Sequence, residues 1–154
     1  MRNNTDPLSE AKKYAFFLLK FRLRSEKEIA SRLAKKKFSE AIISQVLEFL
    51  KTKNFISDEI FAKAWLESRL KKPLGLRRVI QELKEKGIAC EIINDNISRI
   101  KEDYPEKEIV ADIFKKRMSK IKGVDIKKAK ARVYAYLLRR GFSTDAVMEA
   151  VNKS

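Results

Sequence analysis

The chain contains the segment SEKEIASRLAKKKFSEAIISQVLEFL at residues 25–50, and this segment determines the fold because it occurs again. Residues 75–100, GLRRVIQELKEKGIACEIINDNISRI, align with it without a gap at a spacing of 50 residues. A weaker third copy lies at residues 133–151. The coinciding apolar positions include Ile29 with Val79 and Val133, and Leu33 with Leu83 and Leu137. Repetition at this period indicates one supersecondary unit that is stacked several times.

Each copy has the pattern of three helices. A first helix is indicated by apolar pairs at i, i+1, i+4 and i+5, which mark one stripe of a helix. These pairs are Tyr14-Ala15 with Leu18-Leu19, Phe61-Ala62 with Trp65-Leu66, and Ile109-Val110 with Ile113-Phe114. The expected second helices are Ser25–Lys36, Gly75–Lys86 and Asp125–Arg140. The expected third helices are Ser39–Lys51, Ala89–Lys101 and Ser143–Asn152.

Local signals mark the ends of the second helices. Ser25 followed by Glu28 three residues later is a capping box. Gly87 and Gly141 lie where the end of a helix requires a left-handed residue, and Lys37 occupies that position in the first copy. No stretch alternates apolar and polar residues in the way that a strand requires. We therefore predict an all-α protein with three tandem three-helix repeats in an elongated, curved array.

The repeats predict the domain organisation. We expect a flexible N-terminus at residues 1–10, followed by repeats at 11–54, 55–103 and 104–154. A single unit of roughly 45 residues buries little surface, so contacts between neighbouring repeats should contribute to stability. No run of 18 apolar residues and no export signal occurs, so we expect a cytoplasmic protein without a membrane contact.

The composition argues against an enzyme. The chain has no His and one Cys, Cys90, so the commonest general base and the usual zinc ligands are missing. Neither a glycine-rich phosphate loop nor any other cofactor motif is present, and we expect no cofactor and no metal. Cys90 lies beside apolar positions and is expected to be a buried structural thiol. Trp65 lies in an apolar stripe and is expected in the core.

Positive charge is the main functional signal. Lys and Arg number 36 against 21 Asp and Glu, which gives a net charge of +15. Residues 11–53 contain twelve basic and four acidic side chains, and residues 115–140 contain eleven basic and one acidic. Such an excess favours binding to nucleic acid or acidic protein surfaces, although lysines can also simply solvate a helical protein. The candidate binding residues are Arg22, Arg24, Arg69, Lys71, Lys72, Arg77, Arg78, Lys84, Arg117, Lys120, Lys122, Lys127, Lys128, Arg132, Arg139 and Arg140.

Two details limit how these residues could bind. In a helix-turn-helix DNA reader the last helix contacts base edges, but the third helices here begin without basic residues, so any DNA contact should be to phosphates and without sequence preference. Arg22, Arg69 and Arg117 recur at the end of each first helix. They either bond free helix carbonyls or form a periodic row of guanidinium groups that faces a periodic partner.

The motifs of the middle repeat resemble the RecX family of bacterial recombinase regulators. The matching residues are Phe55-Ile56-Ser57-Asp58, Phe61-Ala62, Trp65-Leu66, Arg69, Gly75, Arg78, Ile80, Glu82-Leu83 and Lys86-Gly87-Ile88. The similarity extends over residues 11 to 151. It implies three tandem three-helix repeats and a non-enzymatic protein of DNA repair, recombination and the SOS response. Its partners would be RecA and the RecA filament on single-stranded DNA, and it would inhibit recombinase, ATPase and coprotease activity.

Two alternatives stay open at this point. The chain could be a nonspecific DNA-binding protein that contacts phosphates and needs no RecA, or a helical adaptor for another acidic partner. DNA binding alone should weaken steeply with salt, whereas a complex with RecA should retain affinity from shape and apolar contacts. We expect a monomer in each case.

Overall fold

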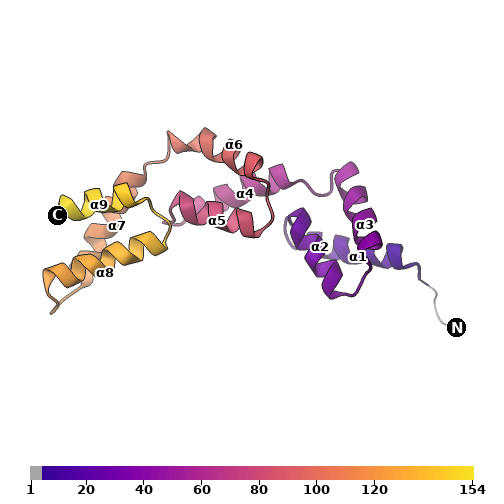
Figure 1. The fold of residues 1–154 in the computed structure, drawn as a ribbon, viewed down its shortest axis with the longest axis horizontal. Coiled ribbons are helices and arrows are strands. Elements are labelled where there is room, and N and C mark those ends of the chain that lie inside the picture. Colours follow the sequence, from indigo (N-terminus) through magenta and orange to yellow (C-terminus); the bar gives the residue numbers. More distant parts are fainter. Residues whose placement is uncertain (1–4) are drawn as a thin grey trace. The chain divides into compact units, whose positions relative to one another are not determined.

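The computed structural model describes residues 5–154, which contain nine helices and no strand (Figure 1). The first repeat contains α1 (Pro7–Leu19), α2 (Glu26–Lys35) and α3 (Glu40–Thr52). The second contains α4 (Asp58–Leu70), α5 (Leu76–Glu85) and α6 (Cys90–Lys101), and the third contains α7 (Glu106–Lys120), α8 (Ile126–Arg139) and α9 (Thr144–Asn152). The all-α class and the tandem three-helix repeats are confirmed, and the second and third helices begin and end within one residue of the predicted positions.

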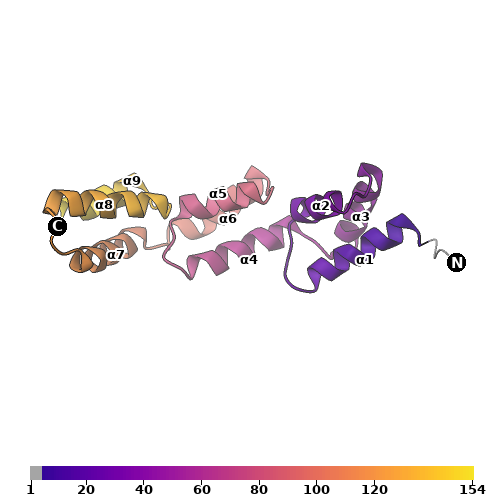
Figure 2. The ribbon, with the colours of Figure 1, turned by 90° about the horizontal axis from the view of Figure 1, so that it is seen from below.

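The chain forms two compact units. Unit one contains the described part of Met1–Ala64 together with Leu83–Ile92, and unit two contains Trp65–Glu82 and Ile93–Ser154. In unit one, α2 and α3 both pack on α1 (Figure 2). In unit two, α8 and α9 pack on α7 in the same way. The boundaries that we predicted between repeats, at 54/55 and 103/104, stay a prediction.

The aligned apolar positions form the cores. In the first repeat Ile29, Leu33 and Leu50 are fully buried together with Ala11 and Ala15. The core of the third repeat consists of Val110, Phe114, Val133, Leu137, Phe142, Ala146, Val147 and Ala150. Because burial of apolar area is the dominant favourable contribution to folding, the period of the sequence fixes which face of each helix points inward.

The helix ends also follow the predicted signals. The Ser25 side chain accepts a hydrogen bond from the Glu28 N–H and the Glu28 side chain accepts one from the Ser25 N–H, so the capping box is present. Lys37, Gly87 and Gly141 have positive φ angles of 67°, 78° and 88°. A non-glycine residue is rare in this region, so Lys37 contains local strain that the two glycines avoid.

The predictions for the N-terminus and for Cys90 are wrong. The flexible N-terminus was expected to reach residue 10, but α1 begins at Pro7 because Asp6 caps it and a proline at the first helical position is favourable; residues 1–4 of that segment lie outside the described residues. Cys90 was expected to be buried, but it is exposed. It is the first residue of α6 and lies among exposed neighbours at the start of the helix, whereas Ile93, one turn later, is buried.

Candidate functional site

The recurring arginine of the first two repeats pairs with a glutamate of the second helix, and Arg22 also donates to the Leu23 carbonyl at 2.8 Å. Arg22 lies beyond the end of α1, and its guanidinium donates to both carboxylate oxygens of Glu28 at 2.8 and 3.1 Å. Arg69, in the last turn of α4, donates to both carboxylate oxygens of Glu82 at 2.6 and 2.8 Å. Such two-point pairs are geometrically specific, so these two arginines have a structural role.

In the third repeat the same arginine stacks on an aromatic ring. The guanidinium carbon of Arg117 lies 3.3 Å from the centre of the Tyr136 ring, and that of Arg140 lies 5.8 Å from it. Tyr136 is at the aligned position of Glu82, and in the first repeat that position is Arg32. Because two guanidinium groups repel each other, Arg22 cannot form an ion pair with Arg32, and it pairs with Glu28 instead.

Glu82 accepts further hydrogen bonds. Trp65 donates its indole N–H to Glu82 at 3.0 Å, and Arg78 donates at 3.4 Å. Burial raises the pKa of Glu82, but hydrogen bonds from Arg69 and Trp65 outweigh it and lower the pKa overall. Trp65, which was expected in the core, is half-buried.

A cationic pocket lies beside the N-terminal end of α2 in unit one. Its volume is about 310 Å³, and we call it the arginine pocket. Its lining consists of Arg22, Arg24, Lys27, Glu28, Ser31, Arg32, Glu85 and Lys86. Among the described residues the buried Nε of Arg24 has no hydrogen-bond partner. Burial, and after it the neighbouring charge of Arg22, lowers the pKa of Arg24. The pocket therefore contains more positive charge than its own carboxylates neutralise.

Glu28 is the main counter-charge of this pocket. Besides Arg22, it accepts from the Lys86 ammonium at 2.6 Å and from the Ser25 N–H at 3.0 Å. Burial raises the pKa of Glu28, but hydrogen bonds from Arg22, Lys86 and Ser25 outweigh it and lower the pKa to about 2. The carboxylate is therefore ionised at all physiological pH values.

The N-terminal end of α5 contacts the C-terminal end of α8 in unit two. The Gly75 N–H donates to the Arg140 carbonyl at 2.9 Å, and the Arg77 N–H donates to the Gly141 carbonyl at 3.2 Å. The Arg78 guanidinium donates to the Arg139 carbonyl at 3.5 Å. Arg140 in turn donates to the carbonyl of Pro73 at 3.3 Å. These contacts bring four candidate arginines together and give Arg78 and Arg140 structural partners.

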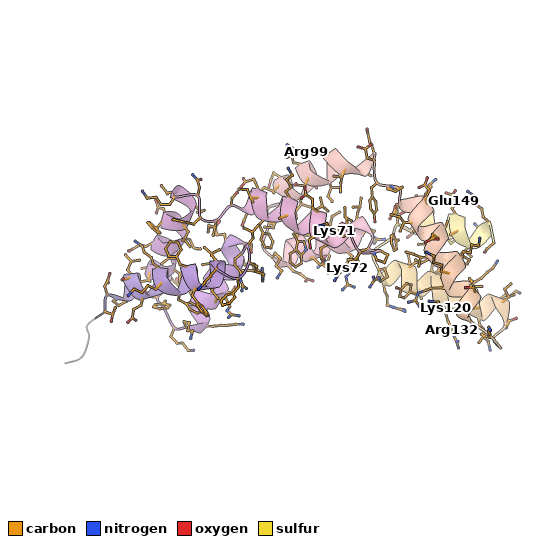
Figure 3. All side chains as sticks on the ribbon, turned by 180° about the vertical axis from the view of Figure 1, so that it is seen from behind. Lys71, Lys72, Arg99, Lys120, Arg132 and Glu149 are labelled. Atoms are coloured by element: carbon orange, nitrogen blue, oxygen red, sulfur yellow. The ribbon has the colours of Figure 1, made fainter. Side chains whose placement is uncertain are left out.

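The predicted basic face of the third repeat is exposed. Lys128, Arg132 and Arg139 on α8 are all exposed and have no ion-pair partner in the part of the chain that the structure describes. Lys120, Lys122 and Lys127 are exposed in or next to the turn that precedes α8. Figure 3 shows Lys120 and Arg132 at one edge of this repeat and Glu149 at the other. Glu149 accepts from Lys107 and Lys153, so the two edges differ in charge balance.

The remaining candidates are separate exposed side chains. Lys71 and Lys72 project from the turn after α4 (Figure 3), and the side chains of Arg77 and Lys84 are exposed on α5. The structure does not gather all the candidates into one site. Sequence reasoning also missed Lys27, Arg32 and Lys86, which line the arginine pocket, because a contact across about 60 residues leaves no local pattern.

Within residues 5–154 no group of three or more His, Cys, Asp or Glu side chains is placed to hold a metal ion. Over the same residues, none of the helices is both long and apolar enough to cross a membrane.

Comparison with known proteins identifies the family. The profiles named "RecX, first three-helix domain", "second" and "third" match residues 11–50, 57–95 and 106–151. The "Regulatory protein RecX" of Chlorobium phaeobacteroides is 37% identical over 90% of this chain and 89% of its own length. That of Caldanaerobacter subterraneus subsp. tengcongensis is 31% identical over 93% of this chain and 70% of its own length.

Solved structures agree on the fold. A crystal structure of regulatory protein RecX has a TM-score of 0.83 at 21% identity, and it matches 97% of this chain and 74% of its own. RecX from Lactobacillus salivarius has a TM-score of 0.78 at 20% identity, with 96% of both chains covered. At these identities the likeness shows the fold alone, and the family follows from the sequence relatives. The resemblance that the middle repeat indicated is confirmed: the chain belongs to the RecX family of regulatory proteins.

Proposed function

We propose that this protein binds RecA and the RecA filament on single-stranded DNA, and that it inhibits recombinase, ATPase and coprotease activity. In this proposal it is a monomeric, cytoplasmic binding protein that uses no cofactor and no catalytic group of its own. Its membership in a family of regulatory proteins supports a regulatory role.

The observation that supports the proposal best is the unpaired basic face of the third repeat. Five of the candidate arginines are already engaged within the fold, namely Arg22, Arg69, Arg78, Arg117 and Arg140. Lys128, Arg132 and Arg139 are exposed and have no ion-pair partner among residues 5–154, so their charge is available to a phosphate or to an acidic protein surface. We therefore assign the contact with the filament to these three residues first, with Lys120, Lys122 and Lys127 beside them.

The tandem organisation supports binding to a partner that is itself repetitive. Exposed basic residues occur in every repeat, such as Lys27 in the first, Lys71, Lys72 and Lys84 in the second and Lys127 in the third. When one repeat is bound, each further contact becomes intramolecular and strengthens the complex without any new kind of interaction. A filament presents equivalent subunits at regular intervals and is such a partner.

The test is the ATP hydrolysis that RecA performs on single-stranded DNA. We expect this chain, added to preformed filaments at physiological salt, to suppress hydrolysis at concentrations well below that of RecA. Strong suppression at a low ratio is expected because one bound molecule would affect several subunits of the filament. Unchanged hydrolysis at equimolar protein would contradict the proposal.

Charge reversal locates the surface. We expect the triple variant K128E/R132E/R139E to lose most of the inhibition. The matched control is K53E/K63E/K101E, because these lysines are also exposed and the net charge also changes from +15 to +9. Equal inhibition by both triple variants would remove the third-repeat face from the proposal and leave only a general effect of charge.

A DNA-binding protein that acts without RecA is the alternative. Phosphate contacts release counterions, so its affinity for bare DNA would fall steeply with salt. Salt-sensitive binding to bare DNA without any effect on RecA would favour this alternative.

A further inference from the structure

Helix α1 exposes a stripe of aromatic rings. Phe17 is 55% exposed and Phe21, just beyond the helix end, is 67% exposed. Their ring centres are 5.0 Å apart, and the ring of Tyr14 lies 6.4 Å from that of Phe17. We call Tyr14, Phe17 and Phe21 the aromatic stripe. Large apolar side chains that remain in contact with water on a highly charged protein mark an interaction site.

The fold does not require the rings of Phe17 and Phe21. In the second repeat the aligned positions of Phe17 and Phe21 are Ala64 and Ser68, and in the third repeat they are Asp112 and Lys116. Both repeats nevertheless form the same first helix. The core of the first repeat is made by Ala11, Ala15 and Leu18, on another side of α1. The two phenylalanines are therefore a property of the first repeat alone and are not explained by its stability.

The aromatic stripe adjoins the arginine pocket. The Arg32 Nε donates to the Tyr14 hydroxyl at 3.4 Å, and the Lys36 ammonium lies 5.1 Å from the centre of the Tyr14 ring. The pocket is lined by five cationic side chains against two carboxylates, and the buried Nε–H of Arg24 has no acceptor. Lys13 on α1 and Lys20 just after it are exposed, and as the i−4 and i+3 neighbours of Phe17 they add positive charge beside its ring.

We propose that the aromatic stripe and the arginine pocket together bind an unpaired nucleic-acid strand. Bases stack on the exposed rings of Phe17 and Phe21, while a phosphate enters the arginine pocket and accepts the free Nε–H of Arg24. Exposed rings beside a positively charged groove are the combination that binds single strands without sequence preference. Duplex DNA offers the phosphates but keeps its bases stacked, so it can use only the pocket.

This inference goes beyond the proposed function because the site needs no RecA. A protein surface is the competing occupant of the aromatic stripe. The observations favour nucleic acid, because the exposed rings offer faces for bases. The neighbouring cations and the unpartnered Nε–H of Arg24 offer partners for the phosphates that alternate with those bases. Binding of the isolated chain to an oligonucleotide therefore tests the site separately from any effect on RecA.

The experiment measures fluorescence polarisation of a labelled thymidine strand of about 15 nucleotides, which is within the usual size of such sites. We expect the F17L/F21L variant to bind roughly tenfold more weakly than the wild type, because leucine retains apolar volume but has no face for stacking. The matched control is F55L, since Phe55 is 50% exposed in the same unit but belongs to a separate group of rings with Phe16 and Phe49. F55L should bind like the wild type, and far-UV circular dichroism should show unchanged helix content in both variants.

Two further ligands and one variant distinguish the contribution of base stacking to the affinity from that of phosphate contact. An abasic strand of equal length should bind the wild type about as weakly as the thymidine strand binds F17L/F21L, and the same should hold for a duplex. R24Q should lower affinity and reduce the slope of log affinity against log salt by about one. F17L/F21L should leave that slope unchanged, because it removes no charge.

Three results would overturn the inference. The first is equal affinity of the wild type for the thymidine strand and the abasic strand, which would leave phosphate contact alone. The second is wild-type affinity of F17L/F21L for the thymidine strand. The third is a loss of RecA inhibition by F17L/F21L with oligonucleotide binding unchanged, which would assign the aromatic stripe to a protein partner.

Discussion

The chain joins its repeats twice, with different chemistry at equivalent positions. At the first junction the Ser25 hydroxyl donates to the Lys86 carbonyl at 2.7 Å, and at the second the Gly75 N–H donates to the Arg140 carbonyl at 2.9 Å. Ser25 aligns with Gly75, and Lys86 aligns with Arg140. In both cases the N-terminal end of one second helix contacts the C-terminal end of the next repeat's second helix, which also aligns opposite ends of the two helix dipoles.

The two junctions differ in how closely the backbones approach. A Cβ on Gly75 would lie 2.1 Å from the carbonyl carbon and oxygen of Gly141, so the second junction is a backbone-to-backbone contact. At the first junction the atoms nearest to a Cβ on Gly87 would be those of the Lys27 side chain, and the contact is made through Ser25 and Glu28. The same geometry can therefore be reached by close packing of glycine or by side-chain hydrogen bonds and ion pairs. A substitution at the second junction should therefore destabilise the protein by steric overlap. A substitution at the first junction should destabilise it by removing individual hydrogen bonds or ion pairs.

The largest expected effect is at the second junction. Gly75→Ala places a methyl group against backbone atoms that cannot move aside, so we expect the free energy of unfolding to fall by about 3 kcal/mol or more. Urea denaturation followed by circular dichroism measures it. Gly123→Ala is the control, because its Cβ would meet nothing within 4 Å and only the positive φ of 70° is unfavourable. A cost no larger than that of the control would mean that the junction opens readily.

Loss of charge at the first junction should have the next largest effect. Glu28→Gln removes the ion pairs with Arg22 and Lys86, and we expect a cost of roughly 2 kcal/mol at pH 7. Glu149→Gln is the control, because its partners are on an exposed surface where solvent screens the charges. Similar losses for the two variants would show that the Glu28 pairs are no stronger than surface pairs.

The same pair predicts a pH dependence. The folded pKa of Glu28 is lowered to about 2, whereas an unfolded glutamate titrates near 4.3. Between these values the unfolded state binds more protons, so stability falls as the pH falls. We expect the wild type to exceed Glu28→Gln in stability fully above about pH 5 and to lose this advantage progressively toward pH 2. Denaturation at a series of pH values measures the difference, and a difference that does not vary over this range would contradict the assignment.

A single hydrogen bond of the first junction can be isolated. Ser25→Ala removes both the helix cap and the bond to the Lys86 carbonyl, and we expect a cost of about 2 kcal/mol. Ser39→Ala removes only a cap, at the start of α3, and should cost about 1 kcal/mol. The cost of Ser25→Ala minus the cost of Ser39→Ala is the contribution of the hydrogen bond from Ser25 to the Lys86 carbonyl. Equal costs would mean that this bond contributes nothing.

The smallest expected effect is a gain in stability. Lys37 aligns with Gly87 and Gly141 and is exposed. Lys37→Gly should stabilise the protein by about 0.5–1 kcal/mol, because glycine relieves the positive φ of 67° at some cost in chain entropy. Lys36→Gly, whose φ is −80°, should instead destabilise it. A loss on Lys37→Gly would show that the lysine side chain contributes more than its backbone strain.

The sequence by itself determined the repeat, the helices and their caps. Ile29, Leu33 and their aligned partners define one buried face at a helical period, and the capping signals at Ser25 and Gly87 are local. The family was also accessible from motifs such as Lys86-Gly87-Ile88. The exposure of Cys90 could not be predicted from the sequence, since apolar neighbours along the chain do not specify whether a residue at the start of a helix is buried.

The tertiary structure alone decided which charges are free. The recurrence of Arg22, Arg69 and Arg117 is visible in the sequence, but their partners Glu28, Glu82 and Tyr136 differ and lie on another helix. The arginine pocket requires Arg24 and Lys86 to meet from different repeats, and the aromatic stripe is notable only because Phe17 and Phe21 remain exposed. Local propensity depends on residues a few positions apart, whereas ion pairing and exposure depend on contacts between distant segments, and these exist only once the helices have packed.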